Sequence, residues 1–317
     1  MLRKATFLTT VAVLALAGCD DRDAVLPGDR LNVREVLETR AGDEDIAPEN
    51  SARPVALPGQ TANADWTQSH VSPGARVAHA ALGAQLTPLW AANIGAGDKR
   101  RARIIADPVA AGGRVFTIDS DNRVQATSTA GEALWSFDLT PLRDANFQAQ
   151  GGGLAYAEGK LFVSSGFGTL TALDPASGQE VWTQKLGNTA TGAPSVRDGL
   201  VYIVSGDTTA WAIETDNGRV RWQIDLPSDV NNVAGAPAPA VNDKYVTFAF
   251  GTGTVQTVFR QGGLRIWNAD ILGRRNGIAL SSVTDVTGDP VIAGDMVYAG
   301  NYSGRMVAFS VYDGERE

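Results

Sequence analysis

The sequence predicts an all-β fold, a β-propeller built of four-stranded antiparallel blades. One tryptophan recurs about every 45 residues, which is the length of one propeller blade. The recurring tryptophans are Trp90, Trp135, Trp182, Trp222 and Trp267. Between them, short apolar segments alternate with turns rich in Gly, Asp and Pro. Segment 201–204 is apolar on both faces, as expected of a strand in a sheet that is covered on each side.

The first 18 residues are predicted to be a lipoprotein signal peptide. A positive start is followed by the apolar segment 5–17, which is too short to span a bilayer with margin. The run Leu16-Ala17-Gly18-Cys19 then predicts cleavage before Cys19 and lipidation of its thiol, which would hold the chain at a membrane surface. The alternatives are an ordinary cleaved signal or a short anchor helix with an incidental cysteine.

Residues 19–60 are predicted to be a flexible linker between this anchor and the propeller, which takes up residues 61–317. The linker is polar and acidic, contains proline, and has no sustained apolar period. Such a segment lets a folded body stand away from the lipid surface.

The blade unit is clearest between residues 151 and 187. We expect four strands at 154–157, 160–164, 169–173 and 180–186, the last of which contains Trp182. Turn residues separate them, so that each strand is followed by an antiparallel neighbour.

A fixed frame of three residues repeats along the chain. Ala172 lies six residues before Gly178 and ten before Trp182. The same spacing is found at Ala212, Gly218 and Trp222 and at Thr257, Gly263 and Trp267, and Ala126, Gly131 and Trp135 follow it one residue short. A glycine in the turn tolerates positive φ, and the tryptophan is expected to pack against the next blade. Stacking on a planar cofactor is the alternative, which the strict period disfavours.

The two ends of the repeat region predict an incomplete ring. Ala308 and Gly314 begin another frame, whose tryptophan would fall one position after Glu317. Trp90 has no full unit before it, which is typical of an N-terminal strand that closes a propeller. We therefore expect four complete blades, a closing strand at Trp90 and a fifth blade without its outer strand. The ring is not expected to close, which indicates a truncated product.

Composition excludes several kinds of site. Cys19 is the only cysteine, so its acylation would leave no disulfide, thiolate nucleophile or cysteine metal site. His70 and His79 are the only histidines, too few for a multi-histidine metal centre. The net charge of −8 argues against nucleic acid as a partner. One basic cluster, 99–103, is interpreted as a solvated loop, with a contact to acidic lipid or protein as the alternative.

The segment 172–182, with its turn and its tryptophan, resembles the repeat of quinoprotein-type propellers. Two families share this repeat: dehydrogenases that bind pyrroloquinoline quinone, and the BamB lipoproteins of the outer-membrane β-barrel assembly machine. Other stretches resemble the BamB family in particular. They are residues 26–30, Asp65-Trp66-Thr67-Gln68 with His79, residues 166–168 and residues 303–308.

The BamB resemblance implies an eight-bladed ring without catalysis or cofactor. It implies binding to the periplasmic domains of the insertase BamA and to other subunits of the machine, and assistance to unfolded outer-membrane proteins. Partner binding in that family uses loops between blades. An acidic family position matches Asp285, a second corresponds to Thr287, and the preceding loop places basic and leucine positions near Asn231 and Asn232. Asp285 has the alternative role of capping a turn before a strand.

The sequence is compatible with more than one membrane location and more than one function. The outer membrane is implied, although Asp20, as second residue of the mature chain, is a signal that keeps enteric lipoproteins at the inner membrane. A quinone-dependent dehydrogenase would need a calcium site and commonly an adjacent-cysteine disulfide, which one cysteine cannot form. No nucleophile elbow or complete phosphate loop is present in the sequence. A generic envelope-tethered adaptor is the remaining alternative.

Overall fold

The computed structural model describes residues 57, 59–68, 79–100, 102–206, 208–227, 237–271 and 285–317. Contacts divide the chain into two units, Met1–Ala56 and Leu57–Glu317, and every described residue belongs to the second. The predicted signal peptide, Cys19 and nearly all of the predicted linker therefore lie outside the described residues. No helix within the described ranges is long and apolar enough to cross a membrane.

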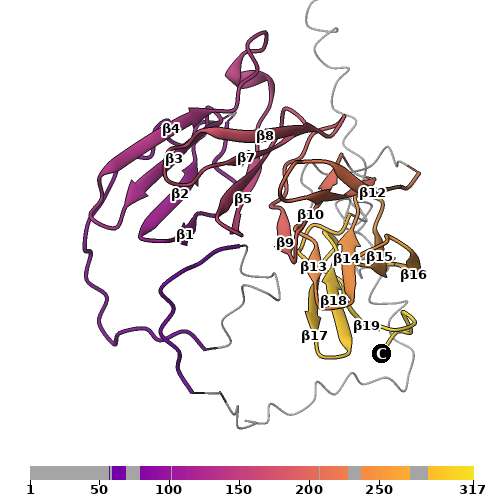
Figure 1. Ribbon diagram of the computed structural model, residues 1–317. Coiled ribbons are helices and arrows are strands. Elements are labelled where there is room, and N and C mark those ends of the chain that lie inside the picture. The colour runs from indigo at the N-terminus through magenta and orange to yellow at the C-terminus, as the bar shows by residue number, and fades with distance from the viewer. Residues whose placement is uncertain are drawn as a thin grey trace, which may run out of the picture. The chain divides into compact units, whose positions relative to one another are not determined.

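The described strands form five antiparallel sheets, here called A to E (Figure 1). Sheet A contains β1 (Val109–Ala111), β2 (Arg114–Ile118), β3 (Arg123–Ser128) and β4 (Ala133–Asp138). Sheet B contains β5 (Gly152–Ala157), β6 (Lys160–Ser165), β7 (Thr169–Leu173) and β8 (Glu180–Lys185). Sheet C contains β9 (Ser195–Arg197), β10 (Leu200–Ser205), β11 (Thr209–Glu214) and β12 (Val220–Asp225). Sheet D contains β13 (Ala240–Val241), β14 (Tyr245–Ala249), β15 (Thr254–Phe259) and β16 (Arg265–Asp270). Sheet E contains β17 (Val291–Ala293), β18 (Met296–Gly300) and β19 (Met306–Ser310).

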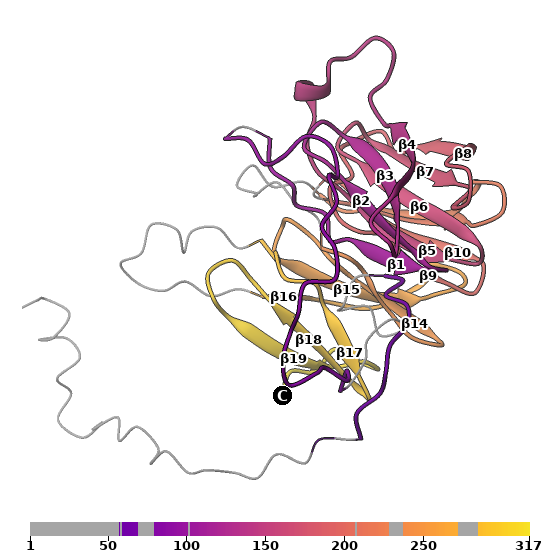
Figure 2. The same cartoon turned by 90° about the vertical axis from the view of Figure 1, so that its left-hand side faces the viewer.

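This arrangement confirms the predicted all-β propeller architecture. Each sheet runs through its strands in chain order, and the first strands contact one another in the order β1, β5, β9, β13 and β17. The second strands β6 and β10 are almost wholly buried, whereas the fourth strands β4 and β12 are largely exposed. An apolar cluster fills each space between consecutive sheets, and within the described residues the sheets do not close into a ring (Figures 1 and 2).

The recurring tryptophans join consecutive sheets, as the sequence predicted. The ring of Trp182 in sheet B lies so close to Gly218 in sheet C that a Cβ there would be 2.7 Å from the indole Cε3. Gly218 also has a φ of +72°, a conformation that favours glycine. The same contact joins Trp135 to Gly178, Trp222 to Gly263 and Trp267 to Gly314. Because the ring faces are covered by the next sheet, packing rather than cofactor stacking explains the period.

Each of these indoles also donates a hydrogen bond to the next sheet. The acceptor is the carbonyl oxygen three residues before the turn glycine. The four Nε1···O distances are 3.0 Å to Pro175, 2.9 Å to Thr215, 3.1 Å to Arg260 and 2.9 Å to Val311. Packing and hydrogen bonding therefore fix the same register at all four junctions.

The strand predicted at Trp90 is not present. Residues 79–100 contain no strand, although the Trp90 ring lies beside Gly131 of sheet A, where a Cβ would be 3.3 Å from its Cε3. A strand needs a neighbouring strand for its backbone hydrogen bonds, and no described sheet edge pairs with this segment. The tryptophan–glycine contact thus forms here without the strand.

Sheet E has three strands, as expected. Two contacts lie where a fourth strand would pair with β19. Phe309 forms an isolated bridge with Arg316, and the Glu317 amide donates a hydrogen bond of 3.2 Å to the Ala308 carbonyl. Tyr298, the third residue of β18 in sheet E, is 39% exposed. Tyr202, the third residue of β10 in sheet C, is fully buried. The outer neighbour that covers Tyr202, Trp222, has no counterpart in sheet E.

Residues 66–68 cross the first strands of three consecutive sheets, and we call this segment the clasp. Trp66 forms a bridge with Ala110 in β1, and the Thr67 carbonyl accepts a hydrogen bond of 2.6 Å from the Tyr156 amide in β5. The Gln68 side chain, 6% exposed, accepts from the Val196 amide at 2.8 Å and donates to its carbonyl at 3.0 Å. The clasp therefore ties sheets A, B and C together at their inner strands.

Candidate partner-binding surface

The connections between sheets lie at one end of the described unit. In an antiparallel sheet of four strands, they share that end with the turns between the second and third strands. We call this the loop end, and we include in it the segment 91–108, which precedes β1. It comprises the described residues 91–100, 102–108, 119–122, 139–151, 166–168, 186–194, 206, 208, 226–227, 237–239, 250–253, 271, 285–290 and 301–305. The Asn122 side chain shows the closeness of two of these segments, since it donates to the Asn146 and Ala149 carbonyls at 2.9 and 3.0 Å. The remaining turns form the opposite end, which we call the turn end.

Two of the residues predicted to bind a partner lie at the loop end, directly before β17. Asp285 is only 1% exposed, and its backbone carbonyl accepts a hydrogen bond of 2.8 Å from the Tyr302 amide. Thr287 and Gly288 are exposed. Asn231 and Asn232 lie outside the described residues. The structure therefore presents Thr287 at the surface and buries Asp285.

Hydrogen bonds to two sheets fix segment 285–289. The Ala238 amide, next to β13 in sheet D, donates to the Asp289 carboxylate at 2.6 Å. In sheet E, Val286 forms a bridge with Asn301, whose side chain donates to the Ile271 carbonyl at 3.0 Å. The exposed Thr287 therefore lies in a segment that is bonded to sheet D through Asp289 and to the β18–β19 turn of sheet E through Val286.

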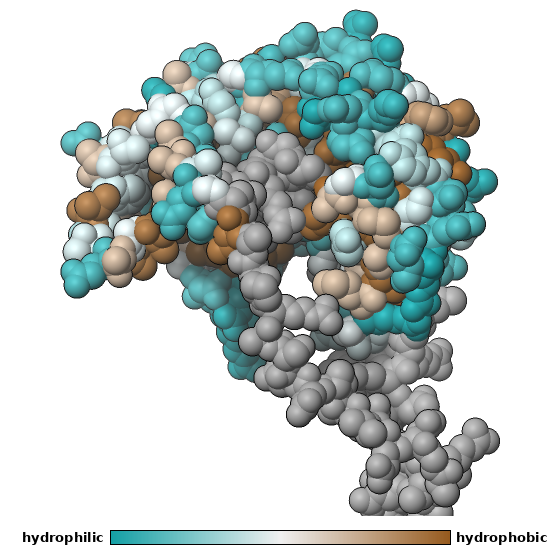
Figure 3. All heavy atoms as spheres, turned by 90° about the horizontal axis from the view of Figure 1, so that it is seen from below, coloured by the Kyte–Doolittle hydropathy of each residue, from teal (hydrophilic) through white to brown (hydrophobic). Residues whose placement is uncertain are grey.

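The connection between β4 and β5 is the second prominent feature of the loop end. Figure 2 shows it projecting from the sheets, with the short 3-10 helix η1 (Asn146–Gln148) near its tip. Leu142 is fully exposed and Phe147 is 75% exposed. Figure 3 views the molecule from below, away from this connection, and shows apolar side chains interspersed with polar ones on the face that it presents. Sequence reasoning missed Leu142 and Phe147 because they follow no strand period. Their position in a long connection rich in turn residues was the only available signal.

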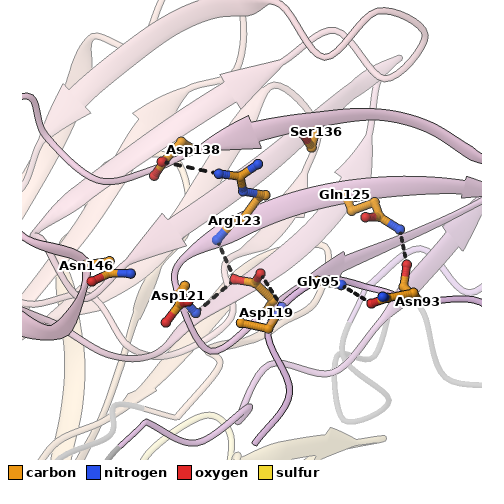
Figure 4. Close-up of a pocket in the computed structure, with 10 residues that line it drawn as sticks. Asn93, Gly95, Asp119, Asp121, Arg123, Gln125, Ser136, Asp138 and Asn146 are labelled. Carbon is orange, nitrogen blue, oxygen red and sulfur yellow. Dashed lines mark hydrogen bonds and ion pairs between the residues drawn. The ribbon is translucent and has the colours of Figure 1, made fainter.

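A polar cavity of about 500 Å³ lies between the loop end and sheet A (Figure 4). Asp119, 6% exposed, accepts hydrogen bonds from the amides of Ala96, Asp121 and Arg123 at 2.8 to 2.9 Å. Gln125 donates to the Asn93 carbonyl at 2.8 Å. These carboxylate and amide groups hold the local backbone around the cavity in place.

Among the described residues, no group of three or more His, Cys, Asp or Glu side chains is placed to hold a metal ion. The basic cluster is partly neutralised by neighbouring acids. Lys99 lies 2.7 Å from Asp121, and Arg103 lies 2.7 Å from Asp98. The Ile104 amide and the Arg103 guanidinium bond the Asp98 carboxylate and lower its pKa. These pairs support the interpretation of the cluster as a solvated loop.

Comparison with known proteins identifies the family. The model of the family described as "Outer membrane protein assembly factor BamB" matches residues 120–317. The protein of that name from Yersinia pestis is 26% identical over 234 residues, which are 72% of this chain and 59% of that protein. The Shewanella oneidensis protein of the same name is 27% identical over 71% of this chain and 58% of that protein. This chain thus spans about three fifths of the length of these curated relatives.

Solved structures show the same fold. BamB from Moraxella catarrhalis superposes with a TM-score of 0.57 at 17% identity, over 68% of this chain and 64% of that chain. The quinohemoprotein alcohol dehydrogenase from Comamonas testosteroni gives a TM-score of 0.60 at 19% identity, over 80% of this chain and 48% of that chain. At these identities the likeness concerns the propeller fold alone. Because the family model covers more than half of the sequence, the predicted resemblance is confirmed, and the chain belongs to the BamB family of outer membrane protein assembly factors.

Proposed function

We propose that this chain is a non-catalytic scaffold in the assembly of outer-membrane β-barrel proteins. The observation that carries the proposal is the family match over residues 120–317, which include most of the described strands. The relatives from Yersinia pestis and Shewanella oneidensis are named assembly factors. A rigid set of sheets with exposed loops suits a protein that holds partners in place.

The proposed partners are the periplasmic domains of BamA, together with other subunits of the assembly machine. We assign their binding to the loop end around Thr287, because this exposed residue is carried by a segment fixed to sheets D and E. Asp285 is buried, so its proposed role is to position that segment. By the family resemblance, Asn231 and Asn232 complete the proposed surface.

The proposed location is the periplasmic face of the outer membrane, with attachment through acyl chains on Cys19. Lipid anchors of this kind hold a protein at a surface without a membrane-spanning segment. Retention at the inner membrane, which Asp20 would favour, is the alternative outcome. Metabolic labelling with a palmitate analogue tests the anchor, and density separation of the two membranes tests the location.

Unfolded outer-membrane proteins are proposed as a second class of partner. The fourth strands, such as β12, have one edge unpaired within the described sheets, and an extended segment adds to such an edge by backbone hydrogen bonds. Photocrosslinking from Arg221 in β12 tests this contact. Trapping of BamA without any nascent barrel protein would count against direct binding of unfolded chains.

Co-purification from detergent-solubilised membranes tests the scaffold proposal. The tagged chain is expected to recover BamA, and Thr287→Arg is expected to lower the recovery about tenfold, since a bulky charge would enter the contact. Gln179→Arg is the matched control, because Gln179 is exposed at the turn end and the charge change is the same. Recovery of a different envelope protein in place of BamA would replace the proposal with a generic adaptor role.

A further inference from the structure

The turn end carries a repeated polar contact between consecutive sheets. Glu158, in the turn after the first strand of sheet B, accepts a hydrogen bond of 2.6 Å from the Thr215 hydroxyl in sheet C. Asp198, at the same turn position of sheet C, lies 2.9 Å from the Arg260 guanidinium in sheet D. Thr215 and Arg260 each lie three residues before their turn glycine. At these two junctions, a turn carboxylate thus binds a side chain at one fixed position of the following sheet. Between sheets A and B the two positions are occupied by Gly112 and Pro175, which cannot form this contact.

The junction between sheets D and E has the turn carboxylate but lacks its side-chain partner in the following sheet. Asp243 occupies the turn position of sheet D, but the residue three positions before Gly314 is Val311, which is buried and apolar. Valine cannot donate a hydrogen bond to a carboxylate. A cavity of about 220 Å³ lies at this junction instead, and Asp243, Tyr245, Asp295, Val311 and Tyr312 are among the residues that line it.

At the junction between sheets C and D, the position three residues before the turn glycine is occupied by an arginine, Arg260. Arg260, 6% exposed, donates to the Asp243 and Arg197 carbonyls at 3.2 Å, in addition to its pairing with Asp198. Asp198 also lies 3.7 Å from Arg197, so one carboxylate serves two guanidinium groups. Asp243 is likewise bonded by Arg197, while its side chain remains 84% exposed and lines the cavity.

Aromatic rings supply the other walls of the cavity. Tyr245 and Tyr312 lie with their ring centroids 6.3 Å apart and their planes at 83°. The Tyr312 hydroxyl donates to the Asp295 carboxylate at 2.6 Å, which fixes the ring beside a second negative charge. Two aspartates and one lysine, Lys244, are the charged residues of the lining. A planar cation that bonds carboxylates and stacks on aromatic rings matches this chemistry.

We propose that the cavity between sheets D and E is a binding site for an arginine side chain of a partner polypeptide. The guanidinium would lie between the Asp243 carboxylate and the rings of Tyr245 and Tyr312. Its role there would correspond to that of Arg260, which pairs with Asp198 at the preceding junction. The site lies at the turn end, whereas the surface assigned above to BamA lies at the loop end. The proposal therefore stands or falls independently of the proposed function.

Titration of the full chain with L-argininamide tests the site, with L-lysinamide as the probe of equal charge. Ring-labelled tyrosine reports binding by NMR, since the chain has six tyrosines and two of them line the cavity. We expect the Tyr245 and Tyr312 signals to shift with an apparent Kd about tenfold lower for argininamide than for lysinamide. Equal responses to the two probes, or no response of these two signals, would overturn the proposal.

Three variants complete the test. Asp243→Asn is expected to raise the apparent Kd for argininamide about tenfold. Asp313→Asn, which removes an exposed carboxylate of the adjacent turn outside the cavity lining, is expected to leave it unchanged. Val311→Arg would supply the guanidinium within the chain and abolish the response. If that variant does not fold, Asp243→Asn decides the matter, and an unchanged Kd for it rejects the site.

Discussion

The indole Nε1 of Trp182 in sheet B donates a hydrogen bond of 2.9 Å to the Thr215 carbonyl oxygen in sheet C. The residues are 33 positions apart, and the same link is repeated at the other three described junctions. Trp182 also contacts Phe162 of its own sheet, with ring centroids 5.8 Å apart. One side chain thus connects the packing of a sheet with that of the sheet that follows.

Trp182→Phe is expected to lower the free energy of unfolding by about 2 to 4 kcal/mol. The substitution removes part of a buried ring and leaves the Thr215 carbonyl without its indole donor. The midpoint of urea unfolding, followed by circular dichroism, measures the change. Trp90→Phe is the control, because Trp90 is 40% exposed and its loss is expected to cost less than about 1 kcal/mol. Equal costs for the two variants would contradict the role given to the buried indole.

Gly218→Ala is expected to destabilise the protein for two reasons that a matched variant separates. The φ of +72° disfavours alanine, and the new Cβ would lie 2.7 Å from the Trp182 ring. Gly187 has a φ of +73°, and a Cβ added there would have nothing within 4 Å, so Gly187→Ala measures the backbone cost alone, about 1 kcal/mol. We expect Gly218→Ala to cost about 2 kcal/mol more in urea unfolding. A difference near zero would show that the indole moves aside freely.

The parts of the fold that repeat along the chain, the sheets and the tryptophan contacts between them, were predictable from the sequence. The spacing of Trp182, Gly178 and Ala172 reflects a contact that every junction repeats, so the pattern predicted both the sheets and the function of the tryptophans. The expected strands between residues 151 and 187 match β5 to β8 within two residues at each end. Local turn chemistry and apolar period suffice for such elements because each is stabilised by neighbours in the chain.

Features that depend on distant or single contacts were not predictable. The strand expected at Trp90 is wrong because no described edge pairs with it, a condition that local sequence does not encode. Asp285 is buried two positions before the exposed Thr287, and the Arg260 contact with Asp198 joins residues 62 positions apart. The related contact between Glu158 and Thr215 joins residues 57 positions apart, so this contact does not recur at one sequence separation that a periodic pattern would show.

Acid is expected to weaken the turn of sheet B through Asp174. Hydrogen bonds from the Ser177 hydroxyl and amide lower the pKa of this carboxyl below its ordinary value. A depressed folded pKa contributes stability at pH values above the unfolded pKa of about 3.9. That contribution is lost as the pH falls through the folded pKa. The difference in stability between the wild type and Asp174→Asn is therefore expected to shrink between about pH 5 and pH 2.

Urea midpoints measured across this range test the Asp174 prediction. Asp144→Asn, in the exposed connection between β4 and β5, makes the same change of net charge away from the turn. A difference from the wild type that stays constant with pH for Asp174→Asn would contradict the assigned hydrogen bonds.

Gln68→Ala is expected to loosen the clasp at sheet C while the contacts of Trp66 and Thr67 persist. The Gln68 amide group satisfies both backbone groups of Val196, and alanine would leave these two groups unpaired at a buried position. We expect a loss of about 1 to 3 kcal/mol and faster hydrogen exchange of the Val196 amide. Exchange of the Tyr156 amide, bonded to the Thr67 carbonyl, serves as the internal control. If both amides exchange faster by the same factor, the clasp unfolds as one piece, and Gln68 holds all three sheets rather than sheet C alone.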